Sequence, residues 1–360
     1  MIQESNHYVL IMAGGIGSRF WPVSRKSLPK QFIDILGTGE SLITQTYNRF
    51  SNIVPEENII VVTNFEYVDM VKKHIPTITD AQILAEPQAR NTAPCIAFAN
   101  AYIKSKNPNA LCVVAPSDHL ITNDSEFKRI INESFEFAAQ YQSLVTIGIK
   151  PTRPDTGYGY IQYNVIPTQG NFHEVKTFTE KPTMELAQSF IDSGEFLWNA
   201  GIFVWHVNTI AQKMETHLPE VAQVFVDIDF NNPNWPNDIE KAYGFCPSIS
   251  IDYGVLEKDD GVYVIPATFG WNDLGTWKSL WGVLEKDEKG NAAVGRKIHI
   301  QDTKGSMVFN GTERLVIANG LNDLVVVESD DVLLIMHKDK EQDLRRIVNQ
   351  MRDEYKGKIT

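Results

Sequence analysis

Short apolar runs alternate with helical patterns through the first half of the chain. Each run is too short for a helix and rich in valine and isoleucine, as is typical of a buried strand. The runs are YVLIMA (8–13), NIIVVTN (58–64), ALCVVAPSD (110–118) and SLVTIGI (143–149). The segment SEFKRIINESFEFAAQ (125–140) instead places apolar residues at spacings of three and four, the period of an amphipathic helix. This alternation predicts an α/β fold, with a Rossmann-like, mostly parallel sheet flanked by helices.

The pattern changes after residue 151. Residues 156–164 and 174–182 read as strands of an insertion, and 198–206 returns to the buried-strand pattern. After a charged break at 286–290, apolar runs recur about every ten residues, which suggests a small all-β domain. Residues 339–355 read as an amphipathic helix. We therefore expect a catalytic domain over 1–285 and a small β-rich C-terminal domain over 286–360 that ends in a helix.

Composition restricts the class of protein. A formal net charge of −12 argues against general nucleic-acid binding, which needs a basic face. Cys95, Cys112 and Cys246 are far apart and fit neither a metal spacing nor a disulfide framework. No apolar run approaches the roughly 20 residues of a membrane helix. These features predict a cytoplasmic protein with no membrane partner.

Against this acidic background, the N-terminal segment concentrates glycine and positive charge. Gly14, Gly15 and Gly17 follow the first apolar run, and Arg19 and Lys30 come soon after. No acidic residue occurs between positions 4 and 34. An incidental turn would explain the glycines but not the cations. A dinucleotide-binding turn needs G-x-G-x-x-G/A, and here a phenylalanine stands where the third small residue belongs. The remaining alternative is a phosphate-binding loop, in which backbone amides and cationic side chains face a polyphosphate.

The segment also resembles a known signature. Residues 14–32 match G-G-x-G-[ST]-R-x-W-P-x-S-R-x-x-x-P-K-Q-F, the signature of the mannose-1-phosphate guanylyltransferases. Further similar blocks follow in order: EPQARNTAPCIA (86–97), APSDH (115–119), DTGYGYIQ (155–162), FTEKP (178–182), WNAGIFVW (198–205), SIDYGVLEK (250–258) and GWNDLGTW (270–277). The resemblance covers about residues 7–285, and it departs from many relatives at Ile16 and Phe20.

The resemblance implies a nucleotidyltransferase fold and one reaction. Mannose 1-phosphate and GTP give GDP-mannose and pyrophosphate when the sugar phosphate attacks the α-phosphorus, with Mg²⁺ as cofactor. Such chemistry depends on positioning and charge neutralisation, so no enzyme nucleophile is expected. Two alternatives remain open: another sugar-1-phosphate nucleotidyltransferase, and a non-catalytic regulatory protein that binds sugar nucleotides. The resemblance also suggests a homodimer, the state common in this family. Because only about 70 residues follow the charged break, we expect no added isomerase domain.

For the phosphates and the metal, the resemblance implies Arg19, Lys30 and Lys181 as catalytic residues. It makes Asp118 a nucleotide-binding residue and, with Asp273, a ligand of Mg²⁺, which prefers carboxylate and phosphate oxygens. Without the resemblance, Asp118 could be a helix cap or a turn residue, and Asp273 would be read as a turn residue beside core aromatic side chains.

The resemblance also implies which residues bind the base and the sugar. Gly14, Gly15, Gly17, Glu86, Asn91 and Thr92 are expected to bind the nucleotide, and Gly157, Glu180, Asn199 and Gly201 the sugar. A carboxylate such as Glu86 could accept the N1–H and N2–H₂ donors of guanine. Asn91 would also suit a helix cap, and Gly157 an ordinary turn. Glu180 and Lys181 would point to opposite faces of a straight strand, so their joint use requires a bend there.

Overall fold

The computed structural model describes residues 6–355 and contains two compact units. The first unit comprises Met1–Gly14, Thr46–Ser117 and Ile121–Trp271. The second comprises Gly15–Gln45, Asp118–Leu120 and Asn272–Thr360. This division differs from a single cut along the chain, and the boundary between residues 285 and 286 stays a prediction. The two-residue strands β5 (Leu120–Ile121) and β11 (Trp271–Asn272) lie where the chain passes from one unit to the other.

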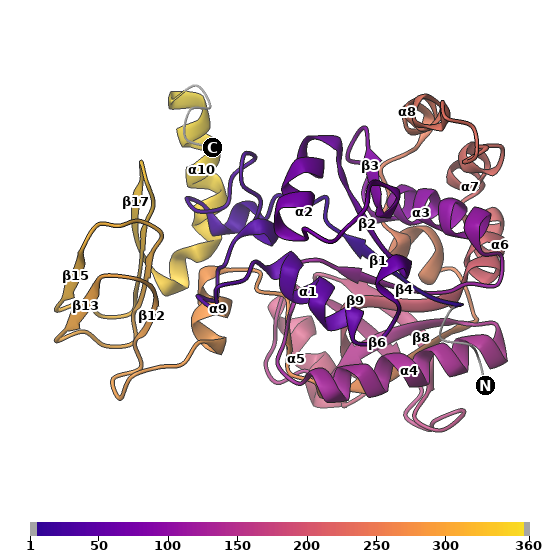
Figure 1. The fold of residues 1–360 in the computed structure, drawn as a ribbon. Helices are drawn as coiled ribbons and strands as arrows, with labels where there is room; N and C mark the ends of the chain where they lie inside the picture. The colour runs from indigo at the N-terminus through magenta and orange to yellow at the C-terminus, as the bar shows by residue number, and fades with distance from the viewer. Residues whose placement is uncertain (1–5, 356–360) are drawn as a thin grey trace. The chain divides into compact units, whose positions relative to one another are not determined.

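A nine-stranded mixed sheet forms the centre of the first unit (Figure 1). Its order is β3-β2-β1-β4-β9-β6-β10-β8-β7. Strands β3, β2, β1 and β4 are parallel, as are β6 and β10, whereas β9 lies antiparallel between β4 and β6. The strands are β1 (His7–Met12), β2 (Ile59–Asn64), β3 (Ile83–Glu86), β4 (Leu111–Pro116), β6 (Leu144–Ile149), β7 (Gly159–Tyr163), β8 (His173–Glu180), β9 (Phe196–His206) and β10 (Val262–Ala267).

Helices flank this sheet, which confirms the predicted fold class. Leu10 and Val114 belong to the core cluster that includes α3, while the alternate residues Val9 and Val113 are equally buried. The central strands are therefore covered on both faces, because successive strand side chains point in opposite directions. The helices of this unit are α2 (Val68–His74), α3 (Thr92–Lys106), α4 (Asp124–Tyr141), α5 (Met184–Ser193), α6 (Val207–His217), α7 (Pro219–Val226) and α8 (Trp235–Phe245), and α1 (Leu42–Ser51) begins in the second unit. Within residues 6–355, no helix is long and apolar enough to cross a membrane.

The C-terminal strands of the second unit stack mostly in parallel. One sheet has the order β12-β14-β16-β17, in which only β17 is antiparallel, and a second sheet pairs β13 with β15. Val308, Ala318 and Val326 form a small core of their own. The elements are α9 (Trp277–Val283), β12 (Ala292–Gly295), β13 (Ile298–Gln301), β14 (Met307–Asn310), β15 (Val316–Asn319), β16 (Leu324–Glu328), β17 (Leu333–His337) and α10 (Leu344–Glu354). The predicted small β domain and its terminal helix are confirmed.

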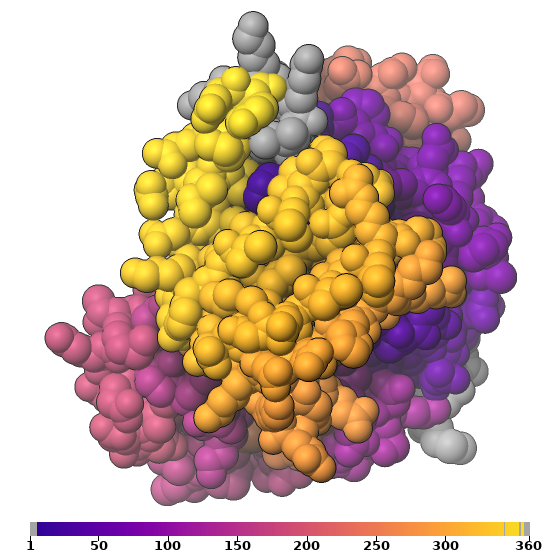
Figure 2. Space-filling model, turned by 90° about the vertical axis from the view of Figure 1, so that its left-hand side faces the viewer, coloured from indigo at the N-terminus to yellow at the C-terminus, as the bar shows by residue number. Residues whose placement is uncertain are grey.

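The glycine-rich segment shares a hydrophobic core with these C-terminal strands. Trp277 stacks edge-on against Phe20, with ring centroids 4.9 Å apart, and against Phe309 at 5.4 Å. The Trp277 indole N–H also donates to the Trp21 carbonyl at 3.2 Å. Further buried members are Ile33, Ile35, Leu274, Leu280, Val294, Met307, Val325, Val327, Leu344 and Val348. Figure 2 looks onto the strands (orange to yellow) and terminal helix (yellow) of this unit. The glycine-rich segment, which carries Arg19 and Lys30, therefore packs against the C-terminal residues.

Candidate active site

A cavity of about 270 Å³ lies within the second unit. It brings together five residues that the sequence predicts for phosphate or metal binding, namely Gly17, Arg19, Lys30, Asp118 and Asp273. The other lining residues are Ser18, Phe20, His119, Leu274 and Gly275. Three separate parts of the chain therefore contribute charged groups to one cavity.

Lys30 is the buried cation of this cavity. Lys30 is the first residue of a short 3₁₀ turn (Lys30–Phe32), and it is only 4% exposed. The ammonium group lies 2.9 Å from Asp118 Oδ2 and donates to the Asp273 carbonyl at 2.8 Å. A Cβ at Gly17 would lie 2.5 Å from the Lys30 Cβ, and Gly17 has a φ of +69°. Glycine is therefore required at position 17 both by its backbone conformation and by the close approach of Lys30.

Asp118 is held in its ionised form. Burial acts to raise the pKa of Asp118, but the charges of Lys30 and His119 oppose burial and hold the pKa below its ordinary value. The His119 ring nitrogen Nε2 lies 4.0 Å from Asp118 Oδ1. The cavity thus presents a carboxylate beside a buried ammonium, an arrangement that can bind both a metal ion and a phosphate oxygen.

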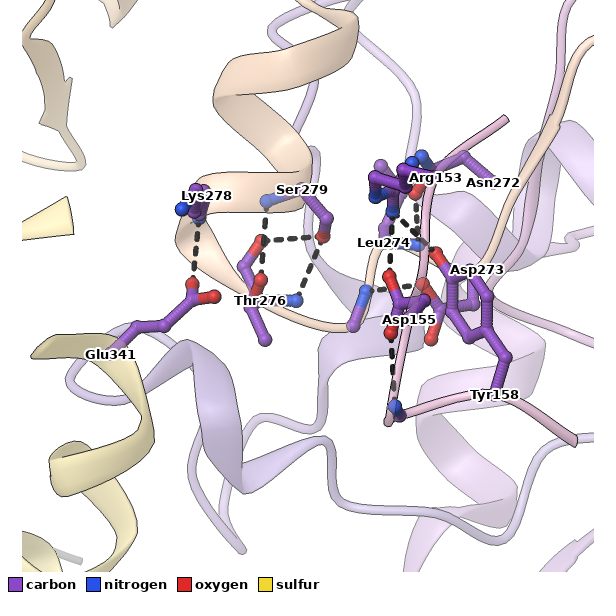
Figure 3. A network of polar contacts seen from close by, with 12 residues as sticks. Arg153, Asp155, Tyr158, Asn272, Asp273, Leu274, Thr276, Lys278, Ser279 and Glu341 are labelled. Atoms are coloured by element: carbon purple, nitrogen blue, oxygen red, sulfur yellow. Dashed lines mark hydrogen bonds and ion pairs between the residues drawn. The ribbon is translucent and has the colours of Figure 1, made fainter. Parts of the chain in front are cut away.

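Two successive turns position Asp273 (Figure 3). The Asn272 side chain accepts from the Leu274 amide at 2.8 Å, and the Asp273 side chain accepts from the Gly275 amide at 2.9 Å. Thr276 and Ser279 then form a capping box that begins α9. These contacts fix the backbone carbonyl that accepts from Lys30 and hold the Asp273 carboxylate at the cavity wall.

Arg19 is the exposed cation of the cavity. It lies in the 3₁₀ turn Ser18–Phe20, whose Phe20 is fully buried while Arg19 itself is exposed. Within the described part of the chain, the Arg19 guanidinium has no hydrogen-bond or ion-pair partner. Gly15, in the same segment, is also exposed, and a Cβ there would meet nothing within 4 Å. An arginine of this kind is available to a bound anion.

In the first unit, Glu86 and Gly14 lie side by side. Glu86 ends β3, and its Oε2 lies 3.3 Å from the position of a Cβ on Gly14. Oε1 accepts from the Tyr243 hydroxyl at 2.9 Å. Burial raises the pKa of Glu86 to about 7, although the Tyr243 hydrogen bond acts to lower it. Near neutral pH, this carboxyl can therefore act as an acceptor only, when ionised, or both donate and accept, when protonated.

Asn91 and Thr92 serve the start of α3. The Asn91 side chain accepts from the Thr92 amide at 2.8 Å, and Asn91 has a φ of 68°. The Thr92 hydroxyl accepts from the Ile251 amide at 2.9 Å. These contacts correspond to the helix-cap alternative, and a direct role of either residue in base binding stays a prediction.

Three polar residues, Lys181, Asn199 and Asp252, lie near Glu180, also in the first unit. A Cβ at Gly159 would lie 2.2 Å from Glu180 Oε1, so Glu180 occupies the space that a side chain there would take. The Asn199 amide donates to Asp252 Oδ1 at 2.9 Å. Burial and the charge of Asp252 raise the pKa of Glu180, whereas the charge of Lys181 lowers it. Burial likewise raises the pKa of Asp252, and the Asn199 hydrogen bond opposes it.

The backbone supplies the bend that the joint use of Glu180 and Lys181 requires. Strand β8 ends at Glu180, and Lys181 adopts a φ of +48°, which turns its side chain out of the strand alternation. Gly201 has a φ of +66°, and its amide donates to Asn199 Oδ1 at 2.9 Å. The Gly157 amide donates to Asp155 Oδ1 at 2.9 Å, which is the turn alternative for that glycine. Carboxylates and an amide so arranged suit the hydroxyl groups of a sugar.

Several residues of these sites were not predicted from the sequence. His119 and Asp252 lie inside blocks that carry the family resemblance, so the blocks contained a signal for them. Gly159 lies in the block around residue 157, where only Gly157 was selected. Tyr243 lies in no such block and follows from the structure alone.

The two aspartates of the cavity fit a magnesium ion. Among residues 6–355, no three His, Cys, Asp or Glu side chains gather as a complete metal site. Magnesium, however, commonly binds one or two carboxylates and completes its shell with substrate phosphates and water. Asp118 and Asp273 line the same cavity and therefore match this mode of binding.

Comparison with known proteins identifies the family. Residues 8–290 match the family model of the nucleotidyl transferases, and residues 295–351 match that of the mannose-phosphate isomerase/GMP-like β-helix domain. The xanthan biosynthesis protein XanB of Xanthomonas campestris pv. campestris is 36% identical, over 98% of this chain and 74% of its own length. The mannose-1-phosphate guanylyltransferase of Escherichia coli is 33% identical, over 95% of this chain and 75% of its own length.

A solved structure shows the same fold. The crystal structure from Thermus thermophilus described as a mannose-1-phosphate geranyltransferase superposes with a TM-score of 0.87 at 31% identity, covering 96% of this chain and 99% of that one. The resemblance drawn from the sequence and the expected enzyme class are confirmed. The chain therefore belongs to the nucleotidyl transferase family, within the group of the mannose-1-phosphate guanylyltransferases.

Proposed function

We propose that the chain transfers GMP from GTP to α-D-mannose 1-phosphate and releases pyrophosphate, giving GDP-mannose. The cavity that joins Arg19, Lys30, Asp118 and Asp273 is the observation that carries the proposal. The relatives named mannose-1-phosphate guanylyltransferase support the choice of GTP and mannose 1-phosphate.

The chemistry is an in-line displacement. A phosphate oxygen of mannose 1-phosphate forms a bond to the α-phosphorus of GTP, the bond from that phosphorus to the bridging oxygen breaks, and pyrophosphate leaves. No group of the enzyme becomes bonded to the substrate. Lys30 and Arg19 bind phosphate oxygens and offset the charge that accumulates during transfer. Asp118 and its contact with Lys30 keep the ammonium group in place.

Enzymes of this family generally use a divalent metal, and we propose that it is Mg²⁺ held by Asp118 and Asp273. When bound, the ion would polarise phosphate oxygens and reduce the repulsion between the two substrates. The chain's own contribution is the two carboxylates, the second of which is fixed by its hydrogen bond from Gly275.

Glu180, Asn199 and Asp252 are proposed to accept and donate hydrogen bonds to the sugar hydroxyls, and Lys181 to bind the sugar phosphate. Their support is that Glu180 and Asn199 both lie against Gly159, that Asn199 donates to Asp252, and that the chain turns at Lys181. Glu86 is proposed to read guanine, because its carboxylate lies beside Gly14 of the glycine-rich segment.

Changing Gly159 to alanine tests the sugar site. The new Cβ would lie 2.2 Å from Glu180 Oε1, so the flexible end of Glu180 must move while the backbone stays. We expect KM for mannose 1-phosphate to rise roughly tenfold, since a hydrogen bond to a charged group contributes about 1.5–3 kcal/mol. KM for GTP and the melting temperature should stay near those of the wild type. Gly282→Ala is the matched control, because a Cβ there meets nothing within 4 Å. An unchanged KM for mannose 1-phosphate in Gly159→Ala would contradict this sugar site.

A pyrophosphate-release assay tests the function as a whole. The purified protein is incubated with mannose 1-phosphate and GTP, ATP, UTP or CTP, with and without magnesium, and then with other hexose 1-phosphates. Magnesium-dependent release with GTP and mannose 1-phosphate is the expected result. Preference for another base or hexose would make the chain a different sugar nucleotidyltransferase. Binding of GDP-mannose without any pyrophosphate release would instead indicate a regulatory protein.

Two further expectations stay predictions. A homodimer agrees with exposed apolar side chains on the C-terminal strands, namely Ile317, Leu333 and Ile335, and with Leu315 just before β15. A cytoplasmic location agrees with three buried cysteines that form no disulfide.

A further inference from the structure

Tyr243 connects a distant helix to the carboxyl group proposed to read guanine. It lies near the end of α8, 157 positions after Glu86, and its hydroxyl donates to Glu86 Oε1 at 2.9 Å. The ring is fully buried and packs edge-on against Phe98 of α3, at 6.1 Å, and Phe225 of α7, at 5.7 Å. Because the ring is fixed by these neighbours, the hydroxyl group can hold the Glu86 carboxyl in one orientation.

The two oxygens of Glu86 have different surroundings. Oε1 carries the hydrogen bond from Tyr243, whereas Oε2 lies beside Gly14, which is exposed. The Watson–Crick edge of guanine presents two donors, N1–H and N2–H₂, and an ionised carboxylate retains enough lone pairs to accept both and the tyrosine bond as well. A neutral carboxyl offers one donor and one acceptor, which complements the N6–H₂ donor and N1 acceptor of adenine.

We propose that Tyr243 is a positioning residue for base selection, whose hydroxyl keeps the Glu86 carboxyl oriented and ionised so that it accepts from guanine. This inference rests on the proposed use of GTP. It adds a residue of α8 to nucleotide selection and makes the choice between guanine and adenine depend on the protonation of one buried carboxyl.

The surroundings of Glu86 set the direction of the pH effect. The titratable groups that face it are Tyr243 on α8 and Cys95 on α3, and burial raises the pKa of each, so both are neutral at pH 7. Cys246, just after α8, faces Tyr243, and burial raises its pKa to about 11 despite the nearby charge of Arg90. Burial raises the pKa of Glu86 itself to about 7. Below that pH guanine binding must first remove a proton, so discrimination in favour of GTP over ATP should increase as the pH rises through 7.

The experiment compares wild type, Tyr243→Phe, Glu86→Gln and the double variant in pyrophosphate release, with GTP and ATP varied separately from pH 6 to 8.5. The readout is the ratio of kcat/KM for GTP to kcat/KM for ATP. Protonation of the triphosphate and its binding of the metal change with pH in the same way for both nucleotides, so they cancel in this ratio. Tyr243→Phe keeps the ring and its packing but removes the hydrogen bond that lowers the pKa of Glu86. We expect KM for GTP to rise about tenfold at pH 7, with kcat at saturating GTP and KM for mannose 1-phosphate near wild type. The rise of the GTP/ATP ratio should move to higher pH, so that alkaline pH partly restores the variant.

Two comparisons separate positioning from general loss of structure. Tyr102→Phe removes another buried hydroxyl, which donates to the Ala81 carbonyl at 2.8 Å in the same aromatic region, and it should leave the ratio unchanged. The double variant should discriminate no worse than Glu86→Gln alone, because both changes act on the same carboxyl. An unchanged ratio and pH profile in Tyr243→Phe, with an active wild type, would overturn this inference alone. A wild type that does not use GTP would overturn the proposed function and the inference with it.

Discussion

Replacing Lys30 with alanine is expected to lower kcat/KM for GTP roughly 100-fold or more, the effect of losing a preorganised charge stabiliser. The reason is its position: the ammonium group is buried in the cavity and held by Asp118 and by the Asp273 carbonyl. Steady-state rates of pyrophosphate release at varied GTP concentration give kcat/KM. Lys30→Arg should not restore the activity, because a planar guanidinium cannot occupy a space shaped for a compact ammonium.

Two variants show whether charge is the cause. Lys30→Met keeps an unbranched stem against Gly17 and Phe20, so it should preserve the melting temperature while losing activity as Lys30→Ala does. Lys26→Ala removes an exposed lysine from the same segment and should leave turnover near that of the wild type. Near-normal turnover in Lys30→Met would remove Lys30 from the chemistry.

Asp118→Asn and Asp273→Asn are each expected to lose most turnover and to require more magnesium. Each keeps the side-chain shape and removes one negative charge, and an asparagine at 273 still accepts from the Gly275 amide. Because both carboxylates are proposed to hold the same ion, the double variant should be little worse than the poorer single variant. Magnesium titrations of turnover for the three variants decide the point.

The control for these changes is Asp339→Asn, which removes an exposed acid of the same unit that pairs with Lys278 at 2.7 Å. Its turnover should depend on magnesium concentration as that of the wild type does. Wild-type magnesium dependence and turnover in either Asp118→Asn or Asp273→Asn would exclude that residue as a ligand.

The strands were predictable where local pattern and burial agree. The apolar runs at 8–13, 58–64 and 143–149 correspond to β1, β2 and β6, because strands covered on both faces must be apolar throughout. The position of β9 was not predictable. Its sequence indicates a buried strand, but nothing local shows that it lies antiparallel between β4 and β6.

The candidate site divides in the same way. The cations and aspartates of the cavity were found because they lie in motifs, and the cap at Asn91 because its signal is local. The pair of Tyr243 and Glu86 depends on two elements that approach each other in the fold, and neither segment signals the other. The left-handed turn at Lys181 was expected only as a bend that the joint use of Glu180 and Lys181 requires, since a lysine gives no sign of a positive φ.

The shared core of the glycine-rich segment and the C-terminal strands has a consequence for how the protein is made. Phe20 and Val348 belong to one hydrophobic cluster although 328 positions separate them (348 − 20). During synthesis at about 5–20 residues per second, the segment leaves the ribosome well before its packing partners exist. It must therefore wait, uncovered, until the last strands and helix emerge. Limited proteolysis of nascent chains should cut within residues 15–45 until residue 348 has emerged from the ribosome, and protection of chains in which it has not emerged would contradict this order of folding.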